Sequence, residues 1–232
     1  MSIVFIADFF AEQVLGGGEL NNEELINILS SRGHEVFKVN SHVLTPQMVE
    51  ENRDKKFIIA NFVNIPANVI PSFYNKQYII YEHDHKYLTT RNPGDFPDFV
   101  AMDSLKFMSE MATVDKKPTY AVMNSQIRHK NTVGAIRFCN VKGYDYKLIE
   151  SRNYKEFLSM MGENKSLVFL PETPETLSRV IVEARMMNMG VVTNKLVGAA
   201  SEPWYALKGH ELIKVFHTKR DEITDIVLDK LS

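Results

Sequence analysis

The fold is decided by residues 170–202, which read LPETPETLSRVIVEARMMNMGVVTNKLVGAASE. An apolar strand end at Leu170 leads into a proline-bearing turn, and apolar residues then recur at helical spacing over 175–189. Gly190 separates this helix from a second apolar strand at 191–193. Strand, helix and strand in this order predict two parallel strands of one sheet, with the helix packed on its face.

The same alternation extends in both directions along the chain. Continuous apolar runs such as 3–7 indicate strands that are buried on both faces of a parallel sheet. Further strands are predicted at 34–39, 56–62, 77–82, 119–123, 146–150, 167–170 and 211–216. Helices are predicted at 19–32, 66–74, 100–111, 130–139, 154–161, 175–189 and 220–231.

The alternation is interrupted once and then restarts. A polar, proline-bearing stretch covers 82–97, and the pattern resumes after Pro118. The sequence therefore predicts an α/β protein of two Rossmann-like, doubly wound lobes that face each other across a cleft, with domains at 1–115 and 116–232. A single doubly wound domain of the flavodoxin or response-regulator kind is the alternative, and the restart disfavours it. In either architecture, ligands bind where strands end and helices begin.

Composition narrows the function classes. The chain has 232 residues, 44% of them hydrophobic, and a net charge of −2, so it has no overall basic field. We therefore expect no nucleic-acid partner, and a local basic patch is the alternative. Cys139 is the single cysteine, which excludes an intrachain disulfide and fits a reducing compartment. The apolar run at 3–7 is short and lacks a basic flank, so we expect a cytoplasmic protein without an integral membrane segment.

Two candidate sites follow predicted strands of the first half. Gly16, Gly17 and Gly18 lie after the first strand, where glycines permit close backbone approach and free helix amides favour anions. A flexible turn is the alternative there. His83 and His85 lie in the stretch Glu-His-Asp-His after the fourth strand and suit acid–base chemistry or a metal. Nothing elsewhere completes a ligand set, so we favour a polar, substrate-facing loop and expect no metal.

Two glutamates of the 170–202 stretch form the third candidate. Glu175 and Glu183 are eight residues apart, about 12 Å along a helix. Glu183 lies between Val182 and Ala184, and a carboxylate in such apolar surroundings needs a partner. Sugar hydroxyls are suitable partners because a carboxylate accepts two of them. The alternative is a helix with two solvated glutamates.

These motifs, taken together, resemble a known family. The stretch from Glu175 to Glu183, followed by Gly190-Val-Val and Gly198 with Glu202, resembles the E-x7-E block of retaining family 4 glycosyltransferases. The glycine-rich loop at 16–19 is similar to the N-terminal G-G-x-E loop of that family. The resemblance implies a GT-B fold, in which the first lobe lies on the acceptor side and the second binds the nucleotide sugar.

The resemblance also implies roles for particular residues. Glu183 would bind the ribose hydroxyls of the donor, and Glu175 would hold the transferred sugar. Either His83 or His85 would contact the donor sugar near the reaction centre. The amides around Gly17 and Gly18 would face the donor phosphates or the acceptor. Gly198, Lys130 and Arg128 would lie at the donor. The pair Lys130-Asn131 resembles the lysine–glycine step that neutralises the leaving pyrophosphate, although an exposed basic turn is the alternative.

The function implied is transfer of a hexose from a UDP or GDP sugar to a carbohydrate or glycoconjugate acceptor. The family retains the anomeric configuration and requires no metal or other cofactor. Some positions depart from the family pattern: Leu177 and Ser178 replace Phe-Gly, and Val191 replaces proline. The second lobe is also short for the family. A non-catalytic relative that binds a nucleotide sugar or a partner protein is therefore the alternative.

Overall fold

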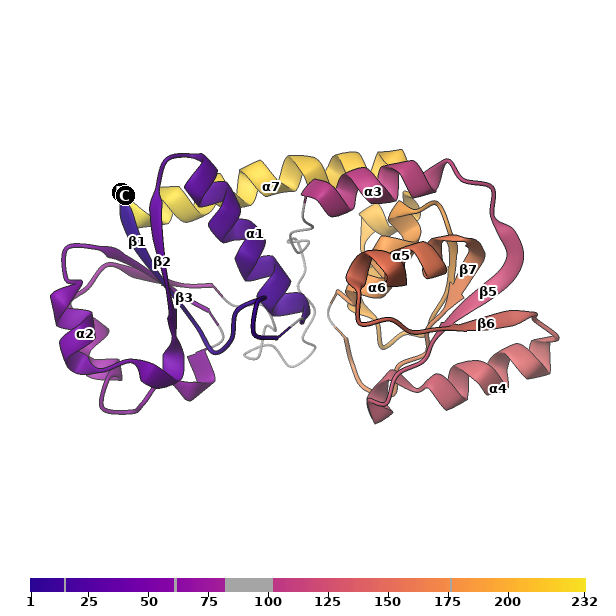
Figure 1. Cartoon of the computed structure of the whole chain (residues 1–232), viewed down its shortest axis with the longest axis horizontal. Helices are drawn as coiled ribbons and strands as arrows, with labels where there is room; N and C mark the ends of the chain where they lie inside the picture. The colour runs from indigo at the N-terminus through magenta and orange to yellow at the C-terminus, as the bar shows by residue number, and fades with distance from the viewer. Residues whose placement is uncertain (15, 61, 82–101, 176) are drawn as a thin grey trace. The chain divides into compact units, whose positions relative to one another are not determined.

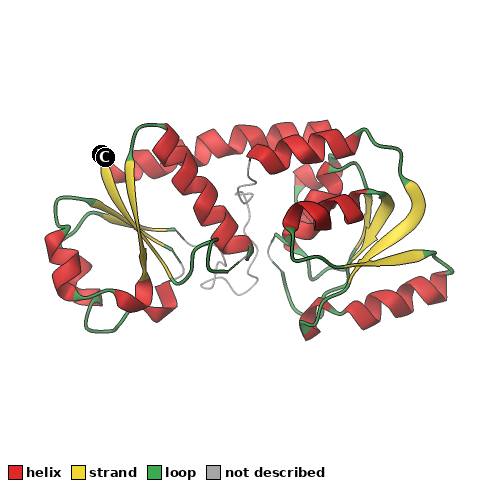
Figure 2. Cartoon of the chain, in the orientation of Figure 1, coloured by secondary structure: helices red, strands yellow, loops and turns green. Residues whose placement is uncertain are grey.

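A computed structural model of the chain describes residues 1–14, 16–60, 62–81, 102–175 and 177–232. It contains two four-stranded sheets in which all paired strands are parallel (Figures 1 and 2). The described residues divide into two compact units. The first holds residues 1–81 and Thr218–Ser232, and the second holds Met102–His217.

The first sheet has the strand order β2-β1-β3-β4. Its elements are β1 (Ser2–Ala7), α1 (Gly17–Ser31), β2 (Glu35–Asn40), α2 (Pro46–Glu51), β3 (Lys56–Ile59) and β4 (Tyr78–Ile80). Strand β1 is buried on both faces, as the continuous apolar run predicts. Ile3 and Phe5 pack with α1, whereas Val4 and Ile6 pack with α2 and the turn at Ile70–Phe73. Helices α1 and α2 therefore cover opposite faces of this sheet (Figure 1).

The second sheet repeats the same order as β6-β5-β7-β8. Its elements are α3 (Met102–Ala112), β5 (Lys117–Met123), α4 (Thr132–Lys142), β6 (Tyr146–Ile149), α5 (Tyr154–Gly162), β7 (Asn164–Val168), α6 (Arg179–Met186) and β8 (Gly190–Val192). Helix α4 packs on one face, where Ala135 and Cys139 meet Val122 and Val168. Helices α3, α5 and α6 contact one another on the other face. In each sheet the parallel strands bring the loops that follow them to one edge.

Helix α7 (His210–Leu231) corrects the prediction of a strand at 211–216, which is helical. A short apolar run does not distinguish a buried strand from a helix, and here tertiary contacts decide. The stripe of Ile223, Val227 and Leu231 packs into the core of the first unit. For this reason residues 218–232 belong to the first unit. The sequence analysis instead assigns them to the second domain, at 116–232.

Helix α6 corrects a second prediction, because it begins at Arg179 and not at residue 175. Ser178 has φ 54°, in the left-handed region, so the chain turns sharply before the helix starts. Glu175 instead forms an isolated parallel bridge with Val197. Two shorter elements also differ: the predicted helix at 66–74 contracts to a 3-10 turn at Ile70–Phe73, and helix α2 is not predicted.

None of the helices in the described ranges has a stretch that is both long and apolar enough to cross a lipid bilayer.

Candidate functional site

Charged side chains of the second unit meet where loops leave the carboxyl edge of its sheet. Lys130 follows β5, and Glu175 follows β7. The Lys130 ammonium donates to Oε1 of Glu175 at 2.6 Å. The side chains are 27% and 13% exposed, so the pair is partly shielded from water but remains accessible from one side. A partly buried ion pair of this kind holds both groups in defined positions.

The backbone of Glu175 is fixed by the loop after β8. The Glu175 amide donates to the Leu196 carbonyl at 2.8 Å, and the Gly198 amide donates to the Glu175 carbonyl at 2.8 Å. Gly198, expected at the donor site, therefore contacts Glu175 directly through the backbone. These two bonds set the direction in which the carboxylate leaves the chain.

Lys130 is positioned by its neighbour Asn131. Asn131 has φ 56°, and its side chain accepts from the Gly134 amide at 3.1 Å, which caps helix α4. The Asn131 amide also donates to the Leu170 carbonyl at 2.8 Å, and the Glu172 amide donates to the His129 carbonyl at 2.8 Å. The loops after β5 and β7 are thus bonded to each other on both sides of Lys130.

Glu183 lies in a second, more deeply buried cluster. Its Oε1 accepts from the Tyr154 hydroxyl at 2.6 Å and from Nε of Arg179 at 3.1 Å. Arg179 Nη2 also donates to the Tyr154 oxygen at 3.2 Å. Burial, reinforced by the Glu183 charge, raises the pKa of Tyr154 above its ordinary value of 10, so the phenol remains a protonated donor even in alkaline solution. Only 4% of the Glu183 side chain is exposed.

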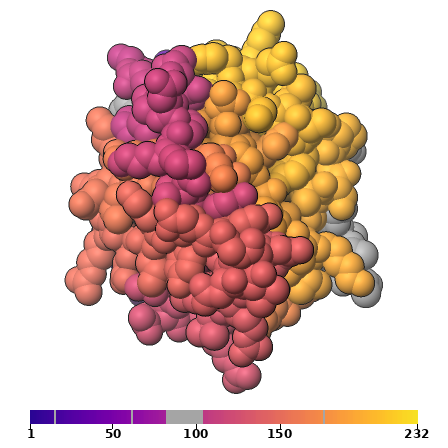
Figure 3. All heavy atoms as spheres, turned by 90° about the vertical axis from the view of Figure 1, so that its right-hand side faces the viewer, coloured from indigo at the N-terminus to yellow at the C-terminus, as the bar shows by residue number. Residues whose placement is uncertain are grey.

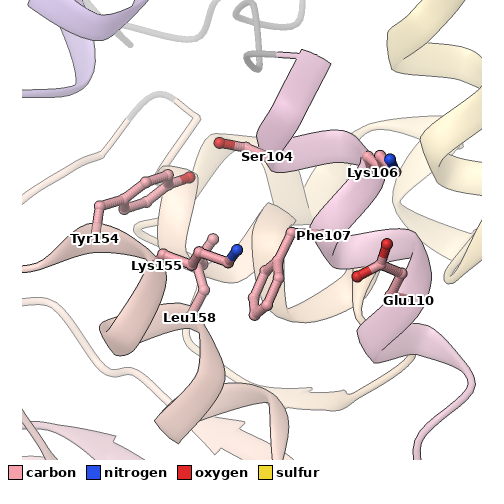
Figure 4. A pocket seen from close by; sticks show the side chains of 7 residues that line it. All are labelled: Ser104, Lys106, Phe107, Glu110, Tyr154, Lys155 and Leu158. Atoms are coloured by element: carbon pink, nitrogen blue, oxygen red, sulfur yellow. The ribbon is translucent and has the colours of Figure 1, made fainter.

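Tyr154 also borders a pocket of about 440 Å³ between helices α3 and α5 (Figure 4). Lys155 reaches across this pocket, and its ammonium lies 5.3 Å from the centre of the Phe107 ring. The lining residues are Ser104, Lys106, Phe107, Glu110, Tyr154, Lys155 and Leu158. Tyr154 therefore joins the Glu183 cluster to a solvent-accessible cavity.

The other predicted site residues lie elsewhere. Arg128 is exposed in the 3-10 turn Arg128–Lys130, two residues before Lys130. Gly17 and Gly18 are the first residues of α1, in the first unit. His83 and His85 lie outside the described residues. Within the described ranges, no three histidine, cysteine, aspartate or glutamate side chains are grouped closely enough to hold a metal ion.

Sequence reasoning missed Tyr154 and Arg179. Arg179 is four residues before Glu183, a spacing that places the two side chains together on a helix, and this signal was present in the sequence. Tyr154 is 29 residues from Glu183 and carries no such signal. The buried glutamate does have partners, as its apolar neighbours predict, and both are protein side chains.

Comparison with known proteins yields matches to solved structures alone, since no protein-family model and no curated protein sequence matches this chain. One structure is an alpha-glucosyltransferase in complex with UDP and a 13-mer DNA that contains a central A:G mismatch. The two chains superpose with a TM-score of 0.53 and are 12% identical in sequence. The alignment covers 96% of this chain and 90% of the other. A second structure is an alpha-glucosyltransferase in complex with UDP and a 13-mer DNA that contains a HMU base. It has a TM-score of 0.50 and 12% sequence identity, and the alignment covers 97% of this chain and 90% of the other. The chain has a GT-B fold.

The comparison also corrects one expectation. The exclusion of a nucleic-acid partner, drawn from the net charge of −2, is wrong, because two structures of this fold contain DNA. The physical reason is that phosphates interact with the cations that face them, within a Debye length of about 10 Å at moderate salt. The sum of charges over a whole chain does not describe that local field.

Proposed function

We propose that this chain transfers a hexose from a UDP sugar to a nucleic-acid acceptor, with retention of anomeric configuration and without a bound metal. The observation that carries the proposal is the Lys130–Glu175 pair at the carboxyl edge of the second sheet, where folds of this class bind nucleotides. The GT-B fold and the UDP and DNA in the two similar structures support the choice of donor and acceptor.

In the proposed reaction, the bond between the anomeric carbon and the β-phosphate oxygen breaks, and UDP leaves with the electron pair. An acceptor hydroxyl bonds to the anomeric carbon and gives its proton to the departing diphosphate. Lys130 would stabilise the charge on that diphosphate, and the exposed Arg128 would approach it from solvent. Glu175 would accept hydroxyls of the sugar and orient it.

Glu183 would hold the ribose of the donor, as the resemblance to family 4 implies. Its Oε1 is already bonded to Tyr154 and Arg179, and its side chain is almost fully covered. Contact with a ribose therefore requires the Tyr154 ring to move aside, and the pocket between α3 and α5 offers space for that movement (Figure 4). We further propose that residues 1–115, with Gly17, Gly18 and His83 or His85, supply the acceptor side.

A second candidate is a protein that binds the donor without turnover. The short second lobe and the departures from the family pattern at Leu177, Ser178 and Val191 favour this reading, because Glu175 and Glu183, the two glutamates expected at the donor, are both present. The two candidates differ in turnover and agree in donor binding.

The experiment combines thermal unfolding with a transfer assay. UDP should raise the midpoint of the wild type by several degrees, whereas GDP should raise it less. Lys130→Ala and Glu183→Gln should reduce the UDP response, and Lys208→Ala, at an exposed lysine, is the matched control. Transfer of labelled glucose from UDP-glucose to DNA establishes the enzyme, and the anomeric signals of the product establish retention. A UDP response without transfer supports the donor-binding alternative, and no response to UDP contradicts both.

A further inference from the structure

The distance between Glu175 and Glu183 is not set by a shared helix. Helix α6 begins at Arg179, so Glu183 lies within it and Glu175 lies in the loop before it. The backbone of Glu175 bonds instead to the loop after β8, through the Leu196 carbonyl and the Gly198 amide. The separation of the two glutamates therefore depends on how that loop is held against α6.

Arg185 of α6 holds the far end of this loop. Its Nη2 shares its protons among three consecutive carbonyl oxygens, at 2.7, 2.8 and 3.0 Å: Tyr205, Ala206 and Leu207. The guanidinium carbon also lies 5.0 Å from the centre of the Tyr205 ring. In the backbone, the Gly209 amide donates to the Arg185 carbonyl at 2.8 Å. Side chain and backbone of Arg185 are thus both bonded to the chain beyond β8.

The charge of Arg185 is directed at backbone and not at a carboxylate. Among the residues that the structure describes, this half-buried side chain forms no ion pair. Carbonyls at the end of a helical turn have no partner within the turn and carry partial negative charge, which a cation stabilises. Arg185 is therefore placed to fix the turn Pro203–Ala206 on α6.

Residues 197–207 form one connected unit. Four amides in turn donate to the carbonyl three residues earlier: Ala200 to Val197 at 3.2 Å, Glu202 to Ala199 at 3.2 Å, Tyr205 to Glu202 at 3.0 Å and Leu207 to Trp204 at 3.0 Å. In Figure 3 this part of the chain, in yellow, lies at the surface of the second unit. Because these bonds connect the two ends of the loop, a contact that fixes 205–207 also restricts Gly198, which is bonded to Glu175.

Helix α6 presents Glu183 and Arg185 to different neighbours. The two residues are separated by about 200° around the helix, since each residue advances the chain by about 100°. Glu183 accepts from Tyr154 of α5, whereas Arg185 donates to the loop after β8. Helix α6 therefore lies between the two contacts and sets the position of one relative to the other.

We propose that Arg185 is a positioning residue for the transfer reaction. By holding 205–207 on α6, it keeps the backbone of Glu175, which orients the sugar, at a constant distance from Glu183, which holds the ribose. The roles of the two glutamates rest on the proposed function, whereas the hold of Arg185 on the loop is measurable without donor or turnover. Arg185 acts through Glu175 and not on the substrate.

The first measurement is amide hydrogen exchange of the full chain by NMR, without any ligand. Arg185→Met removes the guanidinium and keeps an unbranched side chain, and the amides of Glu175 and Gly198 should then exchange about ten-fold faster. Lys116→Met is the matched control, because the Lys116 ammonium also donates to two backbone carbonyls, at the ends of α3 and α5. That variant should lower the unfolding midpoint and leave the exchange of the Glu175 and Gly198 amides unchanged.

The second measurement separates kcat from donor affinity. Arg185→Met should lower kcat for transfer from UDP-glucose about ten-fold and change the Kd of UDP less than about two-fold. The reason is that other elements hold Lys130 and Glu183. Arg185→Lys, whose ammonium can still donate to carbonyls, should give intermediate values of kcat and of amide exchange. This variant also carries the test if Arg185→Met does not fold.

Unchanged exchange of the Glu175 and Gly198 amides in the Arg185 variants, or equal acceleration in Lys116→Met, would overturn the inference. Equal losses of kcat and UDP affinity would also overturn it. The proposed function fails separately. If exchange responds as expected while the wild type neither binds UDP nor transfers glucose, the hold on Glu175 stands and the transferase does not. If the wild type and the Arg185 variants transfer glucose equally fast, the transferase stands and the positioning role does not.

Discussion

The two sheets have the same strand order and parallel direction, yet the loops at their carboxyl edges carry different chemistry. In the first sheet, the carboxylate of Asp8 accepts from neutral groups, the Ser41 hydroxyl and the Asn64 amide. In the second sheet, Glu175 and Glu183 each accept from a cationic side chain. Topology therefore sets where side chains gather, and loop residues decide what they do there.

The neutral cluster of the first sheet is suited to holding loops together. Asp8 follows β1, Ser41 follows β2 and Asn64 follows β3, so one carboxylate joins three loops. Asn40 adds a bond from its side-chain amide to the Asp8 carbonyl at 3.0 Å. The charged pairs of the second sheet are instead suited to exchange partners with a charged or hydroxylated ligand. We therefore expect substitutions at the first edge to change stability and substitutions at the second to change function.

Loss of Glu175 should reduce activity more than any other substitution, because this residue belongs to the edge that we expect to serve function. Glu175→Ala should lower transfer of glucose from UDP-glucose by about 100-fold or more, because it removes an oriented group at the reacting sugar. The unfolding midpoint should change little, since Lys130 remains partly exposed and can be solvated. Glu172→Ala is the control, because that exposed residue contributes a backbone bond to the site. Equal losses in both variants would contradict a specific role for Glu175.

The second prediction concerns Asp8, whose role at the edge of the first sheet we expect to be structural. Asp8→Ala leaves Ser41 and the Asn64 amide without their acceptor and should cost about 2–3 kcal/mol in the free energy of unfolding. In a chain of this size the midpoint should fall by about 5–10 °C. The rise of the midpoint with UDP should keep its wild-type size. Asp54→Ala, at an exposed carboxylate of the same unit, should leave stability unchanged. If UDP no longer raised the unfolding midpoint of Asp8→Ala, the first edge would also serve donor binding, and the two edges would not differ in role.

The fold could be predicted from the sequence wherever burial left a clear pattern. The continuous apolar run at 3–7 predicted a strand buried on both faces, and β1 confirms it. The repeated alternation predicted two doubly wound lobes, which the two sheets confirm. The strand predicted at 211–216 is wrong, because six residues of mixed polarity fit a strand as well as a helix. Residues 223–231 of the same helix pack into the core of the first unit, and these contacts decide in favour of a helix.

The site could be predicted in its residue types but not in its contacts. The apolar neighbours of Glu183 predicted a carboxylate that needs a partner, and the structure buries this side chain, with 4% of it exposed, against two partners. The contact between Lys130 and Glu175 joins residues 45 positions apart, and no local spacing encodes it. Tyr154 is the clearest omission, because a tyrosine at the first turn of α5 is unremarkable until α6 places Glu183 beside it.

A smaller effect is expected at Tyr154, a neutral donor among the charged groups at the carboxyl edge of the second sheet. Tyr154→Phe removes one bond to Glu183 while Arg179 remains, so the loss at pH 8 should be about 1–2 kcal/mol in the free energy of unfolding. The exposed Tyr74→Phe should show no loss.

The pH dependence separates this bond from simple packing. Burial raises the pKa of Tyr154 above its ordinary value of 10. The unfolded phenol therefore loses its proton from about pH 10 upward while the folded phenol keeps it, so its contribution to stability is complete below pH 10 and is lost as the pH rises. Denaturant unfolding at pH 9 and pH 11 should show the advantage of wild type over Tyr154→Phe shrinking by about 1.4 kcal/mol, since other groups titrate equally in both proteins. A constant difference between pH 9 and pH 11 would mean that the phenol is solvated in the folded protein, and that Glu183 is already open to a ribose.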